Sequence, residues 1–443
     1  MGTNESLVEE TGDSSPLVEE TGGAGRLETS KGGDWRRDYA DRMMRTFASP
    51  LLELSHGAGA RVWDVDGNEY LDFLAGIAVN SLGHAHPVIV EAASRQAATL
   101  MHISNYFASE PQLALAERLL RLTGAGDGGR VFFTNSGAEA IEAALKLARR
   151  AGRPRILSLL NSFHGRTMGS LSLTGKATMR EPFEPLIPHV EHIESTIEAL
   201  ERAIGDDVAA LVVEPIKGEA GVIPLPDGYL AEARRITAEH GVLLIVDEIQ
   251  TGAGRTGAWF AFQHEGIVPD AIAVAKGIGG GVPIGALVTF GAASDLLAAG
   301  QHGSTFGGNP FVTAVSDAVL SEIERAGLVE NAAARGRDLV SAILGIGSSL
   351  VSAVEGKGLL LGIQLTAPAA AAVRDAAQAN GLIVNAPTDD RIRIAPPLII
   401  GPAEVAEFAE KFAAALSQVE AALSLVEEAE GRLETGPAEG TTP

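Results

Sequence analysis

Short apolar segments alternate with stretches of helical periodicity between residues 34 and 419, and this alternation constrains the fold more than any other feature. Residues 208–213, 242–246 and 271–275 are apolar and have the length of strands, whereas residues 229–240 space their apolar side chains as a helix does. Strands that alternate with helices form a mostly parallel sheet covered by helices. We therefore expect an α/β fold with a mostly parallel central sheet.

The composition disfavours several classes of partner. Lys and Arg number 34 against 57 Asp and Glu, a net charge of −23, so general attraction to nucleic acid or to an anionic membrane is disfavoured. The chain has no cysteine, which rules out disulfides and thiolate metal sites. It also has no secretion signal and no apolar run of membrane-spanning length. We expect a cytoplasmic protein without a nucleic-acid or membrane partner.

The length and the ends of the chain suggest how it is divided. Because 443 residues exceed one average domain, we expect two subdomains. Both ends are acidic, and both contain the sequence LVEE, which is typical of solvated tails. We predict acidic disordered tails over residues 1–34 and 421–443.

Polar residues follow three of the apolar segments where each predicted strand ends. These residues are Glu214, Asp247 and Lys276, and glycines follow the lysine. Ligands of such sheets bind beyond the carboxyl ends of the strands, so we expect the three side chains to converge on a ligand site. Each residue alone also has a structural explanation, because an acid there can cap the next helix and a lysine can reach solvent.

A predicted helix start supplies a candidate anion site. Residues 132–150 contain an apolar strand end, then Ser136, Gly137, Ala138 and Glu139, which fit a capping box. A helix start presents free N–H groups and partial positive charge to an anion such as phosphate. An ordinary capped helix is the alternative for this stretch taken alone.

Together with the aromatic residue of FHGRT, these features outline a site for a phosphorylated aromatic aldehyde. Over roughly residues 40–415 the chain resembles the class III aminotransferases, which are fold-type I enzymes that use pyridoxal 5′-phosphate (PLP), and among them most closely the acetylornithine aminotransferases. The motifs that carry this resemblance are GIAVNSLGHAHP (76–87), SNYFASEPQ (104–112), FFTNSGAEA (132–140), FHGRT (163–167), VVEPIKGEAGV (212–222), LLIVDEIQTGAGRTG (243–257), AKGIGGGVPIGA (275–286), GSTFGGNP (303–310) and RIAPPL (393–398).

The resemblance implies a large PLP-binding domain over residues 86–311. It also implies a smaller α+β domain built from residues 35–85 and 312–420. The active unit would be a homodimer with its active sites at the subunit interface, because Thr305 of one subunit completes the phosphate site of the other in this family.

The resemblance also implies roles at the cofactor. Lys276 would form the Schiff base with the PLP aldehyde and move the proton during amine transfer. Asp247 would pair with the ring nitrogen, and Phe163 would lie over the ring face. The two implied catalytic residues are thus Lys276 and Asp247. The implied cofactor-binding residues are Ser136, Gly137, Ala138, Phe163, Asp247, Glu248, Ile249, Gln250, Lys276 and Thr305.

The implied substrate contacts are mainly arginines. Arg166 would bind the α-carboxylate of an acylated diamino acid, and Arg393 would bind that of glutamate or 2-oxoglutarate. Glu219 would pair with Arg393 when glutamate is absent, and Ser304 would contact substrate. Ile77 stands where ornithine aminotransferases have tyrosine, which favours an N-acylated donor over free ornithine.

The implied reaction transfers an amine between N2-acetyl-L-ornithine and 2-oxoglutarate, giving N-acetyl-L-glutamate 5-semialdehyde and L-glutamate, as in arginine biosynthesis. Another ω-aminotransferase, acting on ornithine, succinylornithine, succinyl-diaminopimelate or 4-aminobutyrate, is the first alternative. A PLP-binding dimer without catalytic activity is the second.

Some residues depart from the family pattern or invite another interpretation. The family usually has Asn at Ile141, Gln at Lys217 and a larger apolar residue at Ala253. His84 and His86 lack a third candidate ligand, so we expect no metal.

Overall fold

The computed structural model describes residues 34–434. They fall into two compact units, one ending at Glu53 and the other beginning at Leu54. The described part of the first unit contains helix α1 (Trp35–Arg42), which begins after Asp34 because that carboxylate accepts hydrogen bonds from two N–H groups of the first turn. The predicted tails over residues 1–33 and 435–443 lie outside the described residues.

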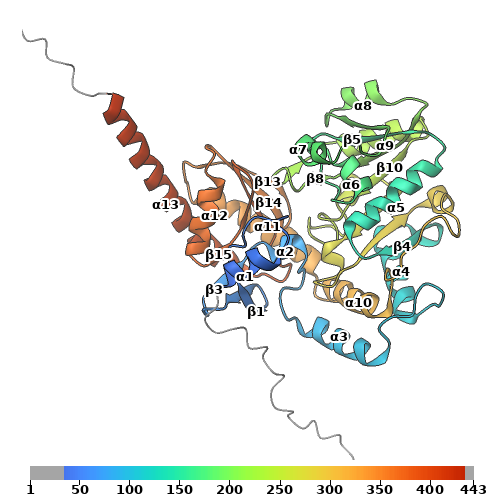
Figure 1. The fold of residues 1–443 in the computed structure, drawn as a ribbon, viewed down its shortest axis with the longest axis horizontal. Coiled ribbons are helices and arrows are strands. Elements are labelled where there is room, and N and C mark those ends of the chain that lie inside the picture. The colour runs from blue at the N-terminus through green and yellow to red at the C-terminus, as the bar shows by residue number, and fades with distance from the viewer. Residues whose placement is uncertain (1–33, 435–443) are drawn as a thin grey trace, which may run out of the picture. The chain divides into compact units, whose positions relative to one another are not determined.

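A seven-stranded sheet forms the larger part of the second unit (Figure 1). Its order is β4-β12-β11-β10-β7-β5-β6, and only β12 runs antiparallel to its neighbours. The strands are β4 (Arg130–Thr134), β5 (Arg155–Leu159), β6 (Val190–Ile193), β7 (Val208–Val213), β10 (Leu243–Asp247), β11 (Ala271–Ala275) and β12 (Gly285–Thr289). The predicted α/β class with a mostly parallel sheet is therefore confirmed.

Helices cover both faces of this sheet because successive side chains of each strand point to opposite faces. Ala271 and Ala273 pack in one cluster with helix α5, whereas Ile272 and Val274 pack in a second cluster that includes α4, α9 and α10. The helices of this part are α3 (Pro87–Thr99), α4 (Glu110–Thr123), α5 (Gly137–Arg150), α6 (Met168–Leu173), α7 (Ala177–Arg180), α8 (Ile197–Ala203), α9 (Tyr229–Glu239) and α10 (Pro310–Arg325).

Two four-stranded sheets and one strand pair complete the described strands. The first sheet joins β1 (Leu54–Ala58), β2 (Arg61–Asp64), β3 (Glu69–Asp72) and β15 (Leu382–Ile383); the second joins β13 (Val351–Lys357), β14 (Leu360–Leu365), β17 (Arg391–Ile394) and β16 (Asn385–Thr388). Strand β8 (Ile216–Lys217) pairs with β9 (Ile223–Pro224). The remaining helices are α2 (Ala75–Ala78), α11 (Leu328–Gly345), α12 (Ala370–Ala379) and α13 (Pro402–Glu434).

The pairing of β3 with β15 joins the two chain segments assigned to the smaller domain. Residues 34–53 nevertheless form a unit of their own, although residues 35–53 had been placed in that domain. The exact division into a large and a small domain stays a prediction.

Helix α13 extends past residue 421, where the C-terminal tail was predicted to begin. It continues to Glu434, so residues 421–434 are helical where a disordered tail was expected. This segment is rich in Ala, Leu and Glu, which favour helix, and Leu423 packs against the core. Its acidic composition hid that helical preference.

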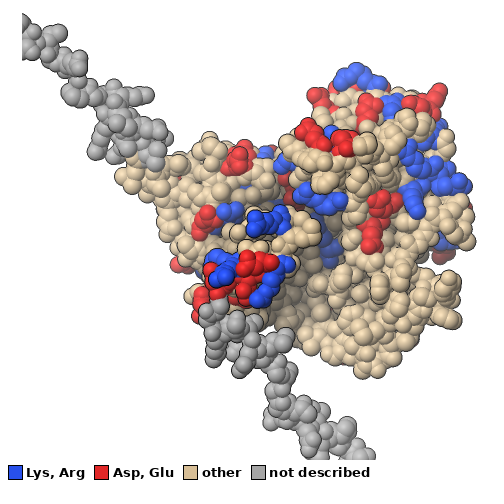
Figure 2. All heavy atoms as spheres, in the orientation of Figure 1, with Lys and Arg blue, Asp and Glu red and all other residues tan. Residues whose placement is uncertain are grey.

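The surface of the second unit is uneven in charge. Charged side chains gather over α8 and beside α5, whereas the face in view over α3 and α10 shows few of them (Figure 2). Within residues 34–434, no helix has both the length and the apolar composition that crossing a membrane requires.

Candidate active site

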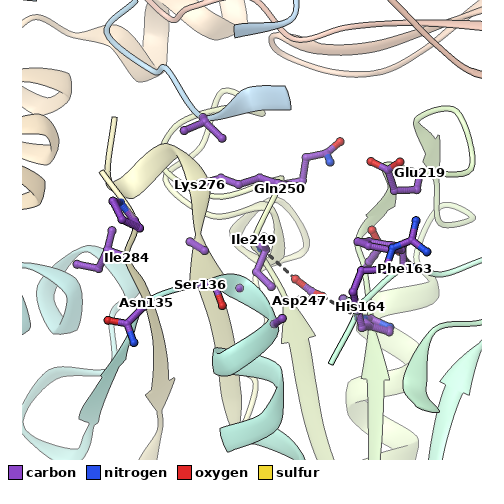
Figure 3. A pocket seen from close by; sticks show the side chains of 18 of the residues that line it. Asn135, Ser136, Phe163, His164, Glu219, Asp247, Ile249, Gln250, Lys276 and Ile284 are labelled. Carbon is purple, nitrogen blue, oxygen red and sulfur yellow. Dashed lines mark hydrogen bonds and ion pairs between the residues drawn. The ribbon is translucent and has the colours of Figure 1, made fainter. Parts of the chain in front are cut away.

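A cavity of about 550 Å³ lies at the carboxyl edge of the seven-stranded sheet (Figure 3). The residues that follow or end β7, β10 and β11 all line it, namely Glu214, Asp247 and Lys276. Ser136 lines it from the start of α5. Its volume is that of a typical small-molecule site. The predicted convergence of these side chains is therefore present in the fold.

Lys276 begins the turn that follows β11 and has a φ of +47°. A lysine in this left-handed region is uncommon, and such strain costs on the order of 1–3 kcal/mol. Burial lowers the pKa of Lys276, which increases the fraction of neutral amine at a given pH. The strained turn thus holds a nucleophilic amine at the cavity.

Asp247 forms a buried pair with His164. Its Oδ2 atom lies 2.7 Å from Nδ1 of His164, and its Oδ1 atom accepts the N–H of Ile249 at 3.0 Å. Burial disfavours protonation of His164, but the carboxylate of Asp247 outweighs burial and raises the pKa of the imidazole. These contacts fix the carboxylate at the end of β10. His164 is not among the residues predicted from the sequence, although it lies within FHGRT between two predicted site residues.

Glu214 anchors the backbone of Phe163. Its Oε2 atom accepts the N–H of Phe163 at 2.7 Å, and its Oε1 atom accepts that of Gly218 at 3.3 Å. Burial raises the pKa of Glu214 to about 7. The carboxyl group therefore joins the segment that carries Phe163 to the segment that follows β7.

The start of α5 is a capped helix that faces the cavity. Ser136 Oγ accepts the N–H of Glu139 at 3.2 Å, and Glu139 Oε2 accepts the N–H of Asn135 at 2.8 Å. Gly137 and Ala138 also line the cavity, and the first N–H groups of a helix lack partners within it. The capped start thereby presents donors to an anion, as P-loop-like helix starts do.

Gly137 leaves room for a neighbouring side chain at this helix start. A Cβ atom there would lie 2.7 Å from Cδ1 of Ile249, so the Ile249 side chain would have to move. Ile249 lines the cavity next to the carboxylate of Asp247. Glycine thus allows α5 to begin directly against the strand end.

Arg393 and Glu219 form an ion pair beside the cavity. Arg393 lies on β17 and is 1% exposed; its Nη1 atom donates to Glu219 Oε1 at 2.6 Å, and its Nη2 atom donates to Asn385 Oδ1 at 2.8 Å. Burial opposes the charge of Glu219, but Arg393 outweighs burial and lowers the pKa of that carboxyl. Gln250 Oε1 lies 3.4 Å from Arg393 Nη1. The predicted pairing of Glu219 with Arg393 is thus observed.

Arg166 lines the same cavity and differs from Arg393 in its surroundings. It is exposed, and among the described residues its guanidinium forms no ion pair. Its Cζ atom lies 5.6 Å from the centre of the Phe163 ring. The cavity is therefore lined by one guanidinium without an ion pair, and a second, neutralised guanidinium lies beside it.

Glu248 is a predicted cofactor residue that the structure places elsewhere. It does not line the cavity; its carboxylate accepts the N–H groups of Ala261 at 3.0 Å and Phe262 at 2.8 Å. Neighbouring residues at a strand end point to opposite faces, so Asp247 faces the cavity and Glu248 does not. Burial raises the pKa of Glu248 to about 7. This side chain therefore orders the segment around residues 260–262, and the role of Glu248 at the cofactor stays a prediction.

Like Arg393 and Glu248, three further predicted site residues do not line this cavity, namely Ser304, Thr305 and Ile77. Ser304 Oγ accepts hydrogen bonds from Asn135 Nδ2 at 3.2 Å and from the N–H of Gly307 at 2.9 Å. Thr305 is exposed, and Ile77 is partly buried with a φ of +66°. The roles assigned to these residues stay predictions.

Two of the departures from the family pattern fill the core. Ile141 is fully buried on α5, and Ala253 is buried with a φ of +56°. Neither side chain lines the cavity. Within the described chain, no group of three or more His, Asp or Glu residues could hold a metal ion.

The sequence profile of the aminotransferase class-III family matches residues 43–416. The chain belongs to this family. The aminotransferase is 51% identical over 368 residues to the acetylornithine aminotransferase of Streptomyces coelicolor, which covers 83% of this chain and 91% of that one. It is likewise 51% identical over 377 residues to the acetylornithine aminotransferase of Mycobacterium tuberculosis, covering 85% and 94%.

Solved structures of similar proteins extend this result. The ornithine aminotransferase of Toxoplasma gondii superposes with a TM-score of 0.83 at 33% identity, over 87% of this aminotransferase and 95% of that chain. The N-acetylornithine aminotransferase of Stenotrophomonas maltophilia gives a TM-score of 0.74 at 36% identity, over 84% and 97%.

Class III aminotransferases depend on PLP, and the residues of this cavity fit that cofactor. Lys276 supplies an amine of lowered pKa, and Asp247 supplies a carboxylate held in place by His164. The start of α5 suits the phosphate, and the ring of Phe163 suits an aromatic ring. The predictions of family and cofactor are therefore confirmed, whereas the role of each residue stays a proposal.

Proposed function

We propose that this aminotransferase transfers the terminal amine of N2-acetyl-L-ornithine to 2-oxoglutarate, giving N-acetyl-L-glutamate 5-semialdehyde and L-glutamate, as in arginine biosynthesis. The observation that carries this proposal is the pair of unlike arginines, Arg166 without an ion pair and Arg393 neutralised by Glu219. Relatives that are about 51% identical and are named acetylornithine aminotransferase support it.

The two arginines suit two different substrates. Arg166 binds the α-carboxylate of the acylated donor through paired N–H donors, which leaves the donor's terminal amine to reach Lys276. While Glu219 neutralises Arg393, the cavity accepts a donor whose reacting end carries no carboxylate. The α-carboxylate of 2-oxoglutarate, which adjoins the reacting carbonyl, then competes with Glu219 for Arg393. One cavity thereby serves both half-reactions.

The remaining site residues hold or move protons. PLP, when bound, supplies the electron sink that stabilises negative charge on the substrate carbon. Lys276 transfers the proton between the substrate carbon and the cofactor carbon, and its lowered pKa makes the neutral amine available as a base. Asp247, oriented by His164, keeps a proton on the cofactor ring nitrogen. Gln250 lies beside both Arg393 and the cavity.

We also propose a homodimer in which Thr305 and Ser304 serve the neighbouring active site. The segments 100–107 and 303–308 lie side by side, because Asn105 Nδ2 donates to the carbonyl oxygens of Ser304 and Gly307. Large apolar side chains on and around these segments are exposed, and an interface with a second chain would cover them. They are Val90, Leu100, Met101, Tyr106, Phe107, Leu113 and Phe306.

The acidic net charge of −23 supports small-molecule partners over nucleic acid or anionic membrane. We place the enzyme in the cytoplasm because its proposed substrates are intermediates of amino-acid biosynthesis.

Steady-state rates with 2-oxoglutarate and each of four donors test the proposed substrate. The donors are N-acetylornithine, ornithine, succinyl-diaminopimelate and 4-aminobutyrate, and we expect the highest kcat/KM with N-acetylornithine. A higher kcat/KM with ornithine or 4-aminobutyrate would overturn the substrate assignment. Turnover of no donor by protein that has PLP bound would instead favour a dimer without catalytic activity.

A further inference from the structure

Lys217 is a buried cation without a carboxylate partner. It lies on β8, is 8% exposed, and forms no ion pair among the described residues. Burial lowers the pKa of Lys217, and the charge of Glu214 opposes that shift. A buried ammonium group is costly unless its hydrogen bonds are satisfied, so its contacts identify what it stabilises.

The amine of Lys217 joins the ends of three neighbouring strands. Its Nζ atom donates to the carbonyl oxygen of Leu160 at 2.6 Å and to Ser195 Oγ at 2.6 Å. Leu160 follows β5, Ser195 lies after β6, and Lys217 follows β7 along the chain. These strands are adjacent in the sheet in the order β7-β5-β6. The hydrogen bond to Leu160 therefore links the segment that follows β7 to the segment that follows β5, and both segments contribute residues to the cavity lining.

The segment after Leu160 carries Phe163 and Arg166 into the cavity. Asn161 has a φ of +61°, so the chain turns sharply directly after the carbonyl that Lys217 holds. Phe163 lies three residues after Leu160, and its N–H donates to the carboxylate of Glu214 at 2.7 Å. Two residues of the segment after β7 thus hold the turn, one on each side of Asn161.

The segment after β7 also reaches the Arg393 side of the cavity. Gly218 and Glu219 directly follow Lys217, and Arg393 Nη1 donates to both, at 3.2 Å to the Gly218 carbonyl oxygen and at 2.6 Å to Glu219. Arg393 is held independently by Asn385. Loss of the Lys217 amine would therefore release the Arg166 side of the cavity and leave the Arg393 side anchored.

We infer that Lys217 is a positioning residue that sets the place of Phe163 and Arg166 and thereby the recognition of the amino donor. It acts through the backbone at Leu160 and touches neither substrate nor cofactor. This inference rests on the proposed function, in which Arg166 binds the donor carboxylate.

The test measures both Michaelis constants of the PLP-saturated enzyme in a matrix of N-acetylornithine and 2-oxoglutarate concentrations. Lys217→Met keeps roughly the length of the side chain and removes the amine that donates the hydrogen bond to Leu160. We expect the KM for N-acetylornithine to rise about 10-fold and the KM for 2-oxoglutarate to change less than about 2-fold. The reason is that the lost charged hydrogen bond holds only the segment that carries Arg166, which binds the amino donor.

Ser195→Ala is the matched control, because it removes the other acceptor of Lys217 and leaves the bond to Leu160. We expect both of its KM values to stay within about 2-fold of the wild-type values. Lys217→Gln keeps an N–H donor on a shorter side chain, and its donor KM should lie between those of the wild type and Lys217→Met. If Lys217→Met does not fold, as judged by thermal unfolding, the same KM split is required of Lys217→Gln.

An unchanged donor KM, or an equal rise in both KM values, would overturn the positioning role. An effect of Ser195→Ala as large as that of Lys217→Met would overturn the role of Leu160. Absence of N-acetylornithine turnover by the wild-type enzyme would contradict the proposed function instead, so the two failures are distinguishable.

Discussion

Two regions of this aminotransferase contribute predicted site residues in different ways. At the carboxyl edge of the seven-stranded sheet, Lys276, Asp247 and the start of α5 line one cavity within a single chain. In the segment 303–308, where Thr305 and Phe306 are exposed, Ser304 and Thr305 line no part of that cavity. The difference teaches that sheet topology alone assembles the first group, whereas the second group requires a neighbouring chain to act as proposed.

The largest expected effect comes from a substitution in the first region, the cavity at the carboxyl edge of the sheet. Lys276→Ala removes the amine that holds the cofactor and moves the proton, so we expect kcat to fall by at least about 1,000-fold. Treatment with borohydride should no longer fix PLP to the protein, which mass spectrometry checks. Lys146→Ala is the control, because Lys146 lies on α5 and its amine contacts Gln301 and His302 outside the cavity. Retention of fixed PLP by Lys276→Ala would refute the role of Lys276.

A somewhat smaller effect on activity is expected from removal of the Arg166 guanidinium, which lines the same cavity. Arg166→Ala should lower kcat/KM for N-acetylornithine by about 100-fold, because a bidentate pair with the donor carboxylate is lost. The rate with 2-oxoglutarate as the varied substrate should change much less, since Arg393 is intact. Equal losses for both substrates would show that Arg166 does not distinguish them.

Thr305→Val tests the second region. We expect the Kd for PLP to rise about 10-fold with the dimer intact, because a hydrogen bond to a charged phosphate is lost across the interface. Equilibrium dialysis measures the Kd, and gel filtration checks the dimer. Thr366→Val is the matched control, because Thr366 is also exposed and, within residues 34–434, its hydroxyl bonds only to the Ser349 carbonyl. A Kd equal to that of the control would remove Thr305 from the site.

The smallest expected effect concerns stability in the first region. Burial raises the pKa of Glu214 from 4.5 to about 7, so between these pH values the folded state keeps a proton that the unfolded state has lost. Stability therefore falls as the pH rises from about 4.5 to about 7. Relative to that of Glu214→Gln, the free energy of unfolding of the wild type should fall by about 1–3 kcal/mol over this range, which urea unfolding measures. A difference independent of pH would show that Glu214 does not titrate in this way.

The same comparison explains what the sequence could predict. Strands β7, β10 and β11 and the residues at their ends follow from local apolar pattern and from the geometry of parallel sheets. His164 was missed because nothing in its local pattern shows that it lies 2.7 Å from Asp247, 83 positions along the chain. The motif likewise does not show that the Glu248 side chain turns away from the cavity, because it names residues without saying which face each side chain takes.

Two other differences have physical causes of a similar kind. The helical residues 421–434 were read as a tail because acidic composition outweighed helix propensity in that prediction. The roles proposed for Ser304 and Thr305 depend on a second chain, whose position no pattern within one chain encodes. Contacts made across the sequence or between chains are thus the part that local pattern leaves open.

The half-reaction with donor alone tests the central claim most directly. PLP-loaded enzyme is mixed with N-acetylornithine in the absence of 2-oxoglutarate, and the semialdehyde is quantified per active site. The account predicts one equivalent of N-acetylglutamate semialdehyde, then one equivalent of glutamate once the unreacted donor is removed and 2-oxoglutarate is added. No semialdehyde before the acceptor is added, or a faster reaction with ornithine, would contradict it.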